Sequence, residues 1–196
     1  HILSIYDECV KAGNPDLAII FASTSKITFP GAGVAAEAAS PKNVALIKSR
    51  MSFQTIGPDK LNQLRHARMF TDIDKIHDHM KLHAEILRSK FETVSKELDS
   101  SLSGLGVATW KKPNGGYFIS MYVTPGCAKR TVELCRNAGL VLTPAGASYP
   151  YSNDPQDSNI RIAPTYPLND ELAKASSLLC TSVKYAALEK LLESSN

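Results

Sequence analysis

The stretch from Ser23 to Gly33 has the residue types most suited to chemistry, and it reads Ser-Thr-Ser-Lys-Ile-Thr-Phe-Pro-Gly-Ala-Gly. Lys26 follows a continuous apolar run, Leu17 to Ala22, which predicts a strand buried on both faces. Burial at the end of such a strand would lower the pKa of the lysine, because a low dielectric disfavours the ammonium form. A neutral lysine is a nucleophile that forms Schiff bases with carbonyl compounds. The same spacing is also compatible with an ordinary solvated lysine at a strand end.

Two serines precede this lysine and two glycines follow it. Ser23 and Ser25 can donate hydroxyl hydrogen bonds to an anion. Gly31 and Gly33 allow backbone amide groups to approach a ligand closely. The segment therefore predicts an anion-binding loop beside a reactive amine.

A second chemically suggestive segment is Asn-Ile-Arg-Ile-Ala-Pro, residues 159–164, in which Arg161 lies between two isoleucines. The pattern predicts a strand, and an arginine buried in a strand needs an anionic partner, because an unpaired buried charge is costly. The planar guanidinium matches a carboxylate with two parallel hydrogen bonds. Arg161 could therefore bind a ligand carboxylate, or it could form a structural salt bridge or lie on an edge strand.

The lysine segment also resembles a known family. Ser-x-Ser-Lys followed by Pro-Gly is similar to the cofactor-lysine segment of fold type I pyridoxal-phosphate enzymes, the aspartate aminotransferase superfamily, and STSKITFPGAGVAAEAAS resembles a bacterial subgroup provisionally named aspartate aminotransferases. The resemblance implies that Lys26 forms the Schiff base with pyridoxal 5'-phosphate and that Ser23 and Ser25 face the cofactor phosphate. Asn-x-Arg-x-Ala resembles the segment whose arginine, here Arg161, holds the substrate α-carboxylate. Many members place an arginine phosphate ligand shortly after the lysine, but residues 31–34 read Gly-Ala-Gly-Val.

The resemblance implies an α/β fold that is divided into two domains. Residues 1–72 would form the end of the large cofactor-binding domain, a mostly parallel sheet with helices. Residues 73–196 would form a bridging helix and a small C-terminal α+β domain. The family works as a homodimer with shared active sites, so Thr55, Asn62 and Gln63 are expected to contact the partner subunit. The resemblance covers only the second half of such an enzyme, so we expect this chain alone to be inactive.

The expected function is an aminotransferase that moves an amino group between an amino acid, aspartate being one candidate, and a 2-keto acid. Three alternatives stay open at this point. A pyridoxal-phosphate-dependent lyase of the same fold could use the same lysine and arginine. A transcription regulator with an aminotransferase-like domain would use the cofactor to sense a ligand, and a purely structural domain would bind no cofactor.

Composition and residue spacing limit the partners, the cellular location and the metal binding that we expect for this protein. The 196 residues carry a small, dispersed net charge of +3, which argues against a nucleic-acid partner. No apolar run approaches the roughly 20 residues of a membrane span. The four cysteines show no Cys-x-x-Cys spacing, which favours reduced thiols and a cytoplasmic location. His79 and His83 are one helical turn apart, but no carboxylate or cysteine set completes a site, so we expect no metal.

Periodicity and turn residues predict the remaining elements. One helix is expected to begin after an N-cap at Ser40, with Pro41 as its first residue, and to end at about Phe53. Other helices are expected over 1–13, 60–70, 72–98, 129–138 and 169–193. Strands are expected over 17–22, 33–39, 107–110, 117–123, 140–143 and 159–164. The chain opens at His1 and not at methionine, so we expect a piece of a longer protein.

Overall fold

The structure is a computed structural model that describes residues 3–195. Its internal contacts divide the chain into two units, His1–His83 and Ala84–Asn196. The division falls inside the long helix α4 (Ile73–Leu102). The domain boundary predicted at the start of that helix stays a prediction.

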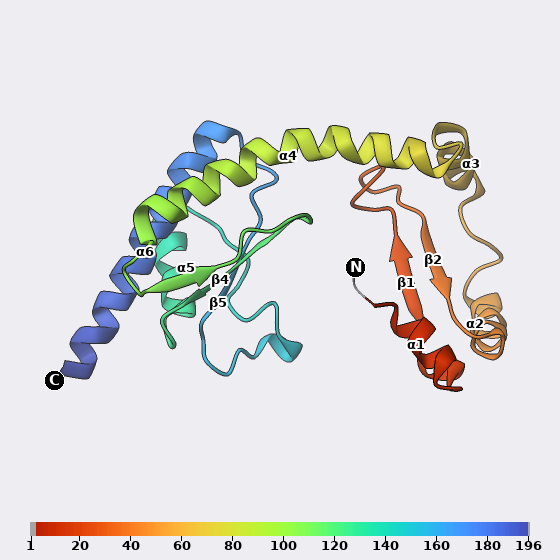
Figure 1. Cartoon of the computed structure of the whole chain (residues 1–196), viewed down its shortest axis with the longest axis horizontal. Coiled ribbons are helices and arrows are strands. Elements are labelled where there is room, and N and C mark those ends of the chain that lie inside the picture. The colour runs from red at the N-terminus through yellow and green to blue at the C-terminus, as the bar shows by residue number, and fades with distance from the viewer. Residues whose placement is uncertain (1–2, 196) are drawn as a thin grey trace. The chain divides into compact units, whose positions relative to one another are not determined.

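The first unit holds a small two-stranded sheet with short helices (Figure 1). Helix α1 (Ile5–Lys11) and the 3₁₀ turn η1 (Pro15–Leu17) precede strand β1 (Ile20–Ser23). Strand β2 (Ala35–Ala38) pairs with β1 in an antiparallel register that sets Ile20 opposite Ala38 and Ser23 opposite Ala35. Helices α2 (Pro41–Gln54) and α3 (Lys60–Met69) follow.

The prediction that the strand before Lys26 is buried on both faces is wrong for this chain. Strand β1 starts at Ile20, because the residues up to Leu17 form η1, and all four of its residues are exposed. Phe21 is 73% exposed. The physical reason is that, within residues 3–195, only β2 pairs with β1, whereas a strand is buried on both faces only when helices cover its sheet.

Local capping chemistry fixes the helices of this unit. The Ser40 hydroxyl accepts a hydrogen bond from the Asn43 backbone N–H at 3.3 Å, and Pro41 occupies the first turn of α2. The Asp59 carboxylate accepts from the Asn62 N–H at 3.0 Å and caps α3 in the same way. The predicted N-cap at Ser40 is confirmed.

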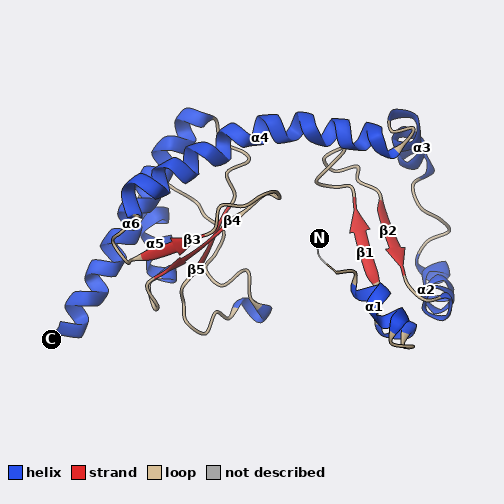
Figure 2. Cartoon of the chain, viewed as in Figure 1, coloured by secondary structure: helices blue, strands red, loops and turns tan. Residues whose placement is uncertain are grey.

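The second unit is built around a three-stranded antiparallel sheet of order β3-β4-β5, drawn red in Figure 2. Its strands are β3 (Ala108–Trp110), β4 (Ile119–Val123) and β5 (Asn159–Ile162). The end of α4, helix α5 (Ala128–Asn137), the turn η2 (Pro150–Ser152) and helix α6 (Asn169–Ser195) complete it. Both sheets in the described residues are antiparallel. The mostly parallel sheet of the large domain therefore stays a prediction.

One predicted strand of this unit is wrong. Residues 140–143 form no strand, because the described ladder is complete with β3, β4 and β5. Leu140 and Leu142 instead pack against the hydrophobic core as irregular chain. A short apolar run such as Leu-Val-Leu indicates burial, which a loop can share with a strand.

The core of this unit lies on one face of the sheet. Ile119, Met121 and Val123 of β4 point into it, and the alternation of side chains leaves Ser120 and Tyr122 on the open face. The helices α4, α5 and α6 complete the core, through residues that include Val94, Leu98, Val132, Cys135, Leu179 and Val183. Residues of β5 follow the same rule, so Ile160 and Ile162 are buried and Arg161 lies on the open face.

No helix within residues 3–195 is long and apolar enough to cross a membrane.

Candidate active site

Lys26 lies in a tight turn that leaves the end of β1. The Thr24 carbonyl accepts hydrogen bonds from the backbone N–H groups of Ile27, at 2.8 Å, and Thr28, at 2.9 Å. The Thr24 N–H donates to the Val34 carbonyl at 2.9 Å and closes the base of the loop. Lys26 is exposed, in contrast to the predicted burial, for the same reason that β1 is exposed. Its side chain is therefore accessible at the top of a loop whose backbone is well defined by hydrogen bonds.

The two predicted serines lie together beside this lysine. The hydroxyl oxygens of Ser23 and Ser25 are 2.7 Å apart, and the Ser25 N–H donates to the Ser23 hydroxyl at 3.1 Å. Both side chains are exposed. A hydroxyl can donate and accept, so the pair can turn its protons toward an anion that approaches from solvent.

Gly33 keeps the far side of the loop close to these serines. A Cβ atom at position 33 would lie 2.8 Å from the Ser25 Cα and 2.9 Å from its backbone nitrogen, which no side chain tolerates. Glycine is therefore required here so that the two limbs of the loop can approach each other.

The three residues predicted to contact a partner subunit lie in the first unit. Thr55 is exposed at the end of α2, where its hydroxyl donates to the Gly57 carbonyl at 2.9 Å. Gln63 is exposed on α3. Asn62 is half-buried, and its side-chain amide donates to the carbonyl of Ala32 at 2.6 Å and to that of Gly33 at 3.3 Å. Asn62 thus already supports the lysine loop within its own chain.

Arg161 lies on the open face of the second unit's sheet, opposite Ser120 of β4. The central carbon of its guanidinium lies 4.6 Å from the centroid of the Phe118 ring, in a cation–π contact. Its Nε atom is buried and has no hydrogen-bond partner within the described residues. Arg161 also forms no ion pair with any carboxylate of residues 3–195 (the six ion pairs there involve other side chains). The structural salt bridge is therefore absent from this part of the chain, and the donors of the fork are available to a ligand carboxylate.

The backbone that leads into β5 is held by Asp154. Its carboxylate accepts hydrogen bonds from the N–H groups of Ser158, at 2.7 Å, Asn159, at 2.8 Å, and Gln156, at 3.1 Å. Partial burial of Asp154 raises its pKa, but the three donors outweigh burial and hold the pKa below the usual 3.8. Asn159 in turn donates from its side chain to the Ser120 hydroxyl at 2.9 Å, which ties β5 to β4 beside Arg161.

The histidine pair on α4 does not gather a metal-ligand set. The rings of His79 and His83 lie 4.4 Å apart, and Phe70 contacts His79 edge-on at 5.3 Å. Within residues 3–195, no group of three or more His, Cys, Asp or Glu side chains converges on one point. That the protein needs no metal stays a prediction.

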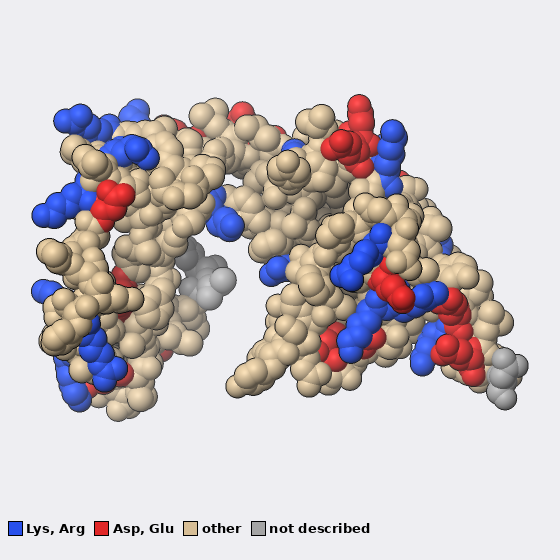
Figure 3. All heavy atoms as spheres, turned by 180° about the vertical axis from the view of Figure 1, so that it is seen from behind, with Lys and Arg blue, Asp and Glu red and all other residues tan. Residues whose placement is uncertain are grey.

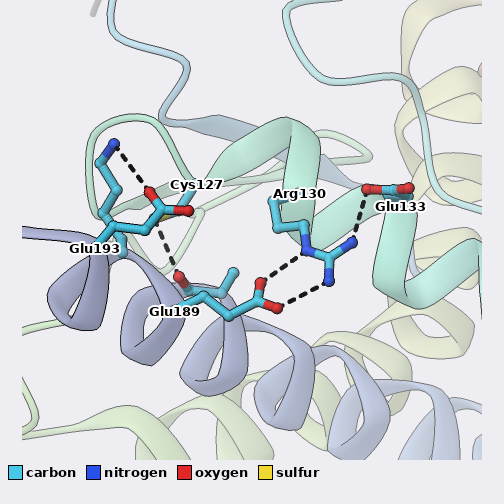
Figure 4. Close-up of polar contacts among 7 residues, drawn as sticks. Cys127, Arg130, Glu133, Glu189 and Glu193 are labelled. Atoms are coloured by element: carbon cyan, nitrogen blue, oxygen red, sulfur yellow. Dashed lines mark hydrogen bonds and ion pairs between the residues drawn. The ribbon is translucent and has the colours of Figure 1, made fainter.

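A hollow of about 580 Å³ in the second unit is lined by charged side chains between α5 and α6. Arg130 donates to both carboxylate oxygens of Glu189, at 2.7 and 2.9 Å, and to Glu133 at 2.9 Å (Figure 4). Burial raises the pKa of the neighbouring Cys127 thiol and keeps it in its unreactive form. Lys190 also lies 3.8 Å from Glu193, so the charged side chains that line this hollow pair with one another within the described residues. Across the face in Figure 3, basic and acidic side chains are interspersed.

Comparisons with known proteins decide the family. A family profile described as aspartate amino-transferase matches residues 2–195. The chain belongs to the aspartate aminotransferase family. A Mycolicibacterium smegmatis protein with a provisional aminotransferase name is 48% identical over 181 residues, which are 92% of this chain and 42% of that protein. The chain thus spans less than half the length of the curated relatives it matches.

Solved structures of aminotransferases share the fold of this chain over the part that they match. The crystal structure of an aspartate transaminase from Corynebacterium glutamicum is 44% identical, with a TM-score of 0.92 over 96% of this chain and 44% of that chain. The α-aminoadipate aminotransferase LysN from Thermus thermophilus, complexed with N-(5'-phosphopyridoxyl)-L-leucine, is 19% identical, with a TM-score of 0.75 over 94% of this chain and 46% of that chain. The second likeness concerns the fold alone.

The residues described here fit a phosphorylated aldehyde cofactor. Lys26 offers an accessible amine, and the paired hydroxyls of Ser23 and Ser25 offer two donors to a phosphate within the same turn. Residues 31–34 supply no arginine, so within this loop the hydroxyls and backbone amides are the available phosphate ligands. Sequence reasoning missed three side chains that hold this turn, those of Thr24, Thr28 and His66. The only sequence signal for them is their polarity, since His66 is about forty residues from the two threonines.

Proposed function

We propose that this chain is the C-terminal part of a pyridoxal-phosphate-dependent aminotransferase, in which Lys26 bonds covalently to the cofactor aldehyde. The observation that carries the proposal is the turn that presents Lys26 beside the hydroxyl pair of Ser23 and Ser25, whose oxygens are 2.7 Å apart. Bound pyridoxal phosphate supplies the electron sink that makes the α-proton of an amino acid acidic. Ser23 and Ser25 would donate hydrogen bonds to the phosphate and thereby help to hold the cofactor beside Lys26.

Lys26 has a second role once the substrate amine has replaced it. Its freed Nζ would take the proton from the substrate α-carbon as a positioned general base and would give it up again as a general acid. Such proton transfer contributes typically 10²- to 10⁴-fold to a rate. The turn that holds the Lys26 backbone limits the positions the amine can reach, which is the form of pre-organisation that efficient proton transfer needs.

Arg161 binds the α-carboxylate of the substrate in this proposal. Phe118 holds its guanidinium by a cation–π contact at 4.6 Å, and no carboxylate within residues 3–195 competes for it. A bidentate pair with the substrate carboxylate would then use guanidinium donors that form no ion pair with the residues that the structure describes. The substrates are an amino acid and a 2-keto acid, and aspartate is the amino acid that we propose, since relatives are named aspartate aminotransferase.

We further propose a cytoplasmic homodimer with shared active sites, in which Thr55, Asn62 and Gln63 approach the partner subunit. The four cysteines are free thiols, which supports a reducing compartment. Residues 1–72 would belong to the cofactor-binding domain and residues 73–196 to the bridging helix and the small domain. The exposed faces of β1 support the proposal that this chain alone is inactive, because they leave apolar side chains such as Phe21 uncovered.

The test compares three forms of the full-length protein: wild type, Lys26→Ala, and the control Lys48→Ala on the exposed surface of α2. Each is supplied with pyridoxal phosphate, aspartate and a 2-keto acid, and both products are quantified. We expect amino transfer by the wild type and by Lys48→Ala, and a loss of at least about 10²-fold in Lys26→Ala. Equal turnover by Lys26→Ala would refute the role of Lys26.

The remaining alternatives give different products in the same assay. Consumption of the amino acid without any 2-keto acid acceptor would identify a lyase. Cofactor binding at Lys26 without turnover of any amino acid tested would favour a ligand-sensing regulator. An unbound cofactor would favour a structural domain.

A further inference from the structure

The turn that carries Lys26 is attached to helix α3 through a partly buried polar cluster that the proposed chemistry does not use. The cluster consists of Thr24, Thr28 and His66, and we call it the threonine–histidine clamp. Thr28 is only 7% exposed, and a hydroxyl buried to this extent must be hydrogen-bonded or it destabilises the fold. Its oxygen lies 2.7 Å from Nε2 of His66.

The proton positions of the clamp follow from its partners. Nδ1 of His66 lies 2.9 Å from the Asn62 backbone carbonyl, which can only accept, so Nδ1 carries the proton. In the neutral ring Nε2 is then the acceptor, and the Thr28 hydroxyl donates to it at 2.7 Å. The Thr24 hydroxyl oxygen lies 3.3 Å from the same nitrogen and 3.1 Å from the Thr28 hydroxyl oxygen. The two threonines, one before and one after Lys26, therefore meet at this edge of the His66 ring.

The clamp also reaches the closing limb of the loop. The Thr24 hydroxyl accepts a hydrogen bond from the Val34 N–H at 2.8 Å. Asn62, one helical turn before His66, donates to the carbonyls of Ala32 and Gly33. Helix α3 thus holds both limbs of the Lys26 loop through Asn62 and His66, which lie on the same face of the helix.

An aromatic contact supports the same attachment. The Phe29 ring meets the His66 ring edge-on at a centroid distance of 5.1 Å, and the Arg65 guanidinium lies 5.8 Å from the Phe29 centroid. Phe29 follows Thr28 directly, so the polar and the aromatic contacts act on adjacent residues of the turn. The imidazole is therefore held on its edge by hydrogen bonds and on its flank by a ring.

We propose that the threonine–histidine clamp sets the position from which Lys26 reaches its cofactor and substrate, and that His66 and Thr28 are positioning residues of the reaction. This inference rests on the proposed role of Lys26. Lys26 lies two residues from each threonine, inside the turn that the backbone and side chains of Thr24 and Thr28 anchor. A variant with a weakened clamp still contains the Lys26 amine, but the amine samples a wider range of positions. Proton transfer depends steeply on the position of the base.

The experiment uses the full-length protein with Thr28→Val, which removes the hydroxyl and keeps the shape, and with His66→Leu and His66→Gln. The matched controls are Thr93→Val, which loses a hydroxyl bonded to the Ser89 carbonyl at 2.9 Å, and His77→Gln, which lies exposed on α4. The first measurement is hydrogen exchange of the cofactor-free protein. We expect the amides of Ile27 and Thr28 to exchange about tenfold faster in Thr28→Val and His66→Leu, and at the wild-type rate in both controls.

The second measurement is steady-state turnover normalised to the cofactor bound at Lys26. We expect kcat to fall about tenfold or more in Thr28→Val and His66→Leu, with KM changed less than about threefold, because proton transfer is impaired and carboxylate binding is not. His66→Gln offers an amide oxygen to Thr28, so it recovers part of kcat. A change of the absorbance band of the Lys26-linked cofactor accompanies the loss.

Each of the following outcomes would refute one part of the proposal. Unchanged exchange of the Ile27 and Thr28 amides in both variants would show that the clamp does not hold the turn. Faster exchange with normal kcat and an unchanged band would show that the clamp is structural and does not position Lys26. Cofactor attachment to another lysine would refute the proposed function and the positioning role together, while the exchange result would still decide whether the clamp holds the turn.

Discussion

The role of Arg161 makes a prediction whose size can be worked from its contacts. Arg161→Lys keeps the positive charge but replaces the planar fork by a single ammonium group. One of two charge-assisted hydrogen bonds to the substrate carboxylate is lost, which costs about 1.5–3 kcal/mol. The cation–π contact with Phe118, 4.6 Å from the guanidinium, is lost as well and is worth about 0.5–1 kcal/mol. Together these amount to about 2–4 kcal/mol, or a fall in kcat/KM of about 30- to 850-fold.

The assay is amino transfer by the full-length protein over a range of amino-acid concentrations, with two further variants. Phe118→Leu removes the ring alone and should lower kcat/KM only about two- to fivefold. Arg136→Lys, on the exposed end of α5, changes the same residue type away from the sheet and should have no effect. If Arg161→Lys stays within about threefold of wild type, Arg161 does not bind the carboxylate and the reasoning is refuted.

Three other predictions concern stability and reactivity. Leu98→Ala, at a fully buried core position, should destabilise the protein to urea by about 2–5 kcal/mol, while Leu105→Ala, 54% exposed, should cost much less; equal losses would contradict the described core. The pKa of Asp154 is lower in the folded protein than its value of 3.8 in the unfolded chain. The ionised carboxylate therefore stabilises the fold above pH 3.8, and this stabilisation is lost as the pH falls through the lower pKa of the folded state. The free energy of unfolding should therefore fall less steeply with decreasing pH, below about pH 4, for Asp154→Asn than for wild type. Identical pH dependence would contradict the three hydrogen bonds from backbone N–H groups to Asp154. Burial raises the pKa of Cys180 to about 11, so its thiol should resist maleimide at neutral pH until the protein unfolds, and rapid labelling of the native protein would show that it is not buried.

Local signals in the sequence were sufficient for most helices and for the strand that contains Arg161. Ser40 with Pro41 predicts the start of α2, and the apolar stripe of α4 predicts its length to within a few residues. Arg161 between two isoleucines predicts β5 and the face on which the guanidinium lies. Each of these patterns depends on neighbours in the sequence, which is why it can be read without the fold.

Features that depend on distant partners could not be predicted in the same way. The burial predicted for β1 requires chain that would cover the sheet, and within residues 3–195 the strand has only β2 beside it. The threonine–histidine clamp joins residues 38 and 42 positions apart, and no local pattern marks such a pair. Residues 140–143 begin with the short apolar run Leu-Val-Leu that is typical of a strand, but Leu140 and Leu142 pack against the core without a ladder.

The most direct test of the account is to find where the cofactor is attached. The full-length protein is loaded with pyridoxal phosphate, reduced with sodium borohydride to fix any bond between a lysine and the aldehyde, digested, and mapped by mass spectrometry. We predict one modified peptide, labelled on Lys26 between Ser25 and Ile27, and no such peptide in Lys26→Ala. Labelling of a different lysine, or equal labelling of Lys26→Ala, would contradict the central claim.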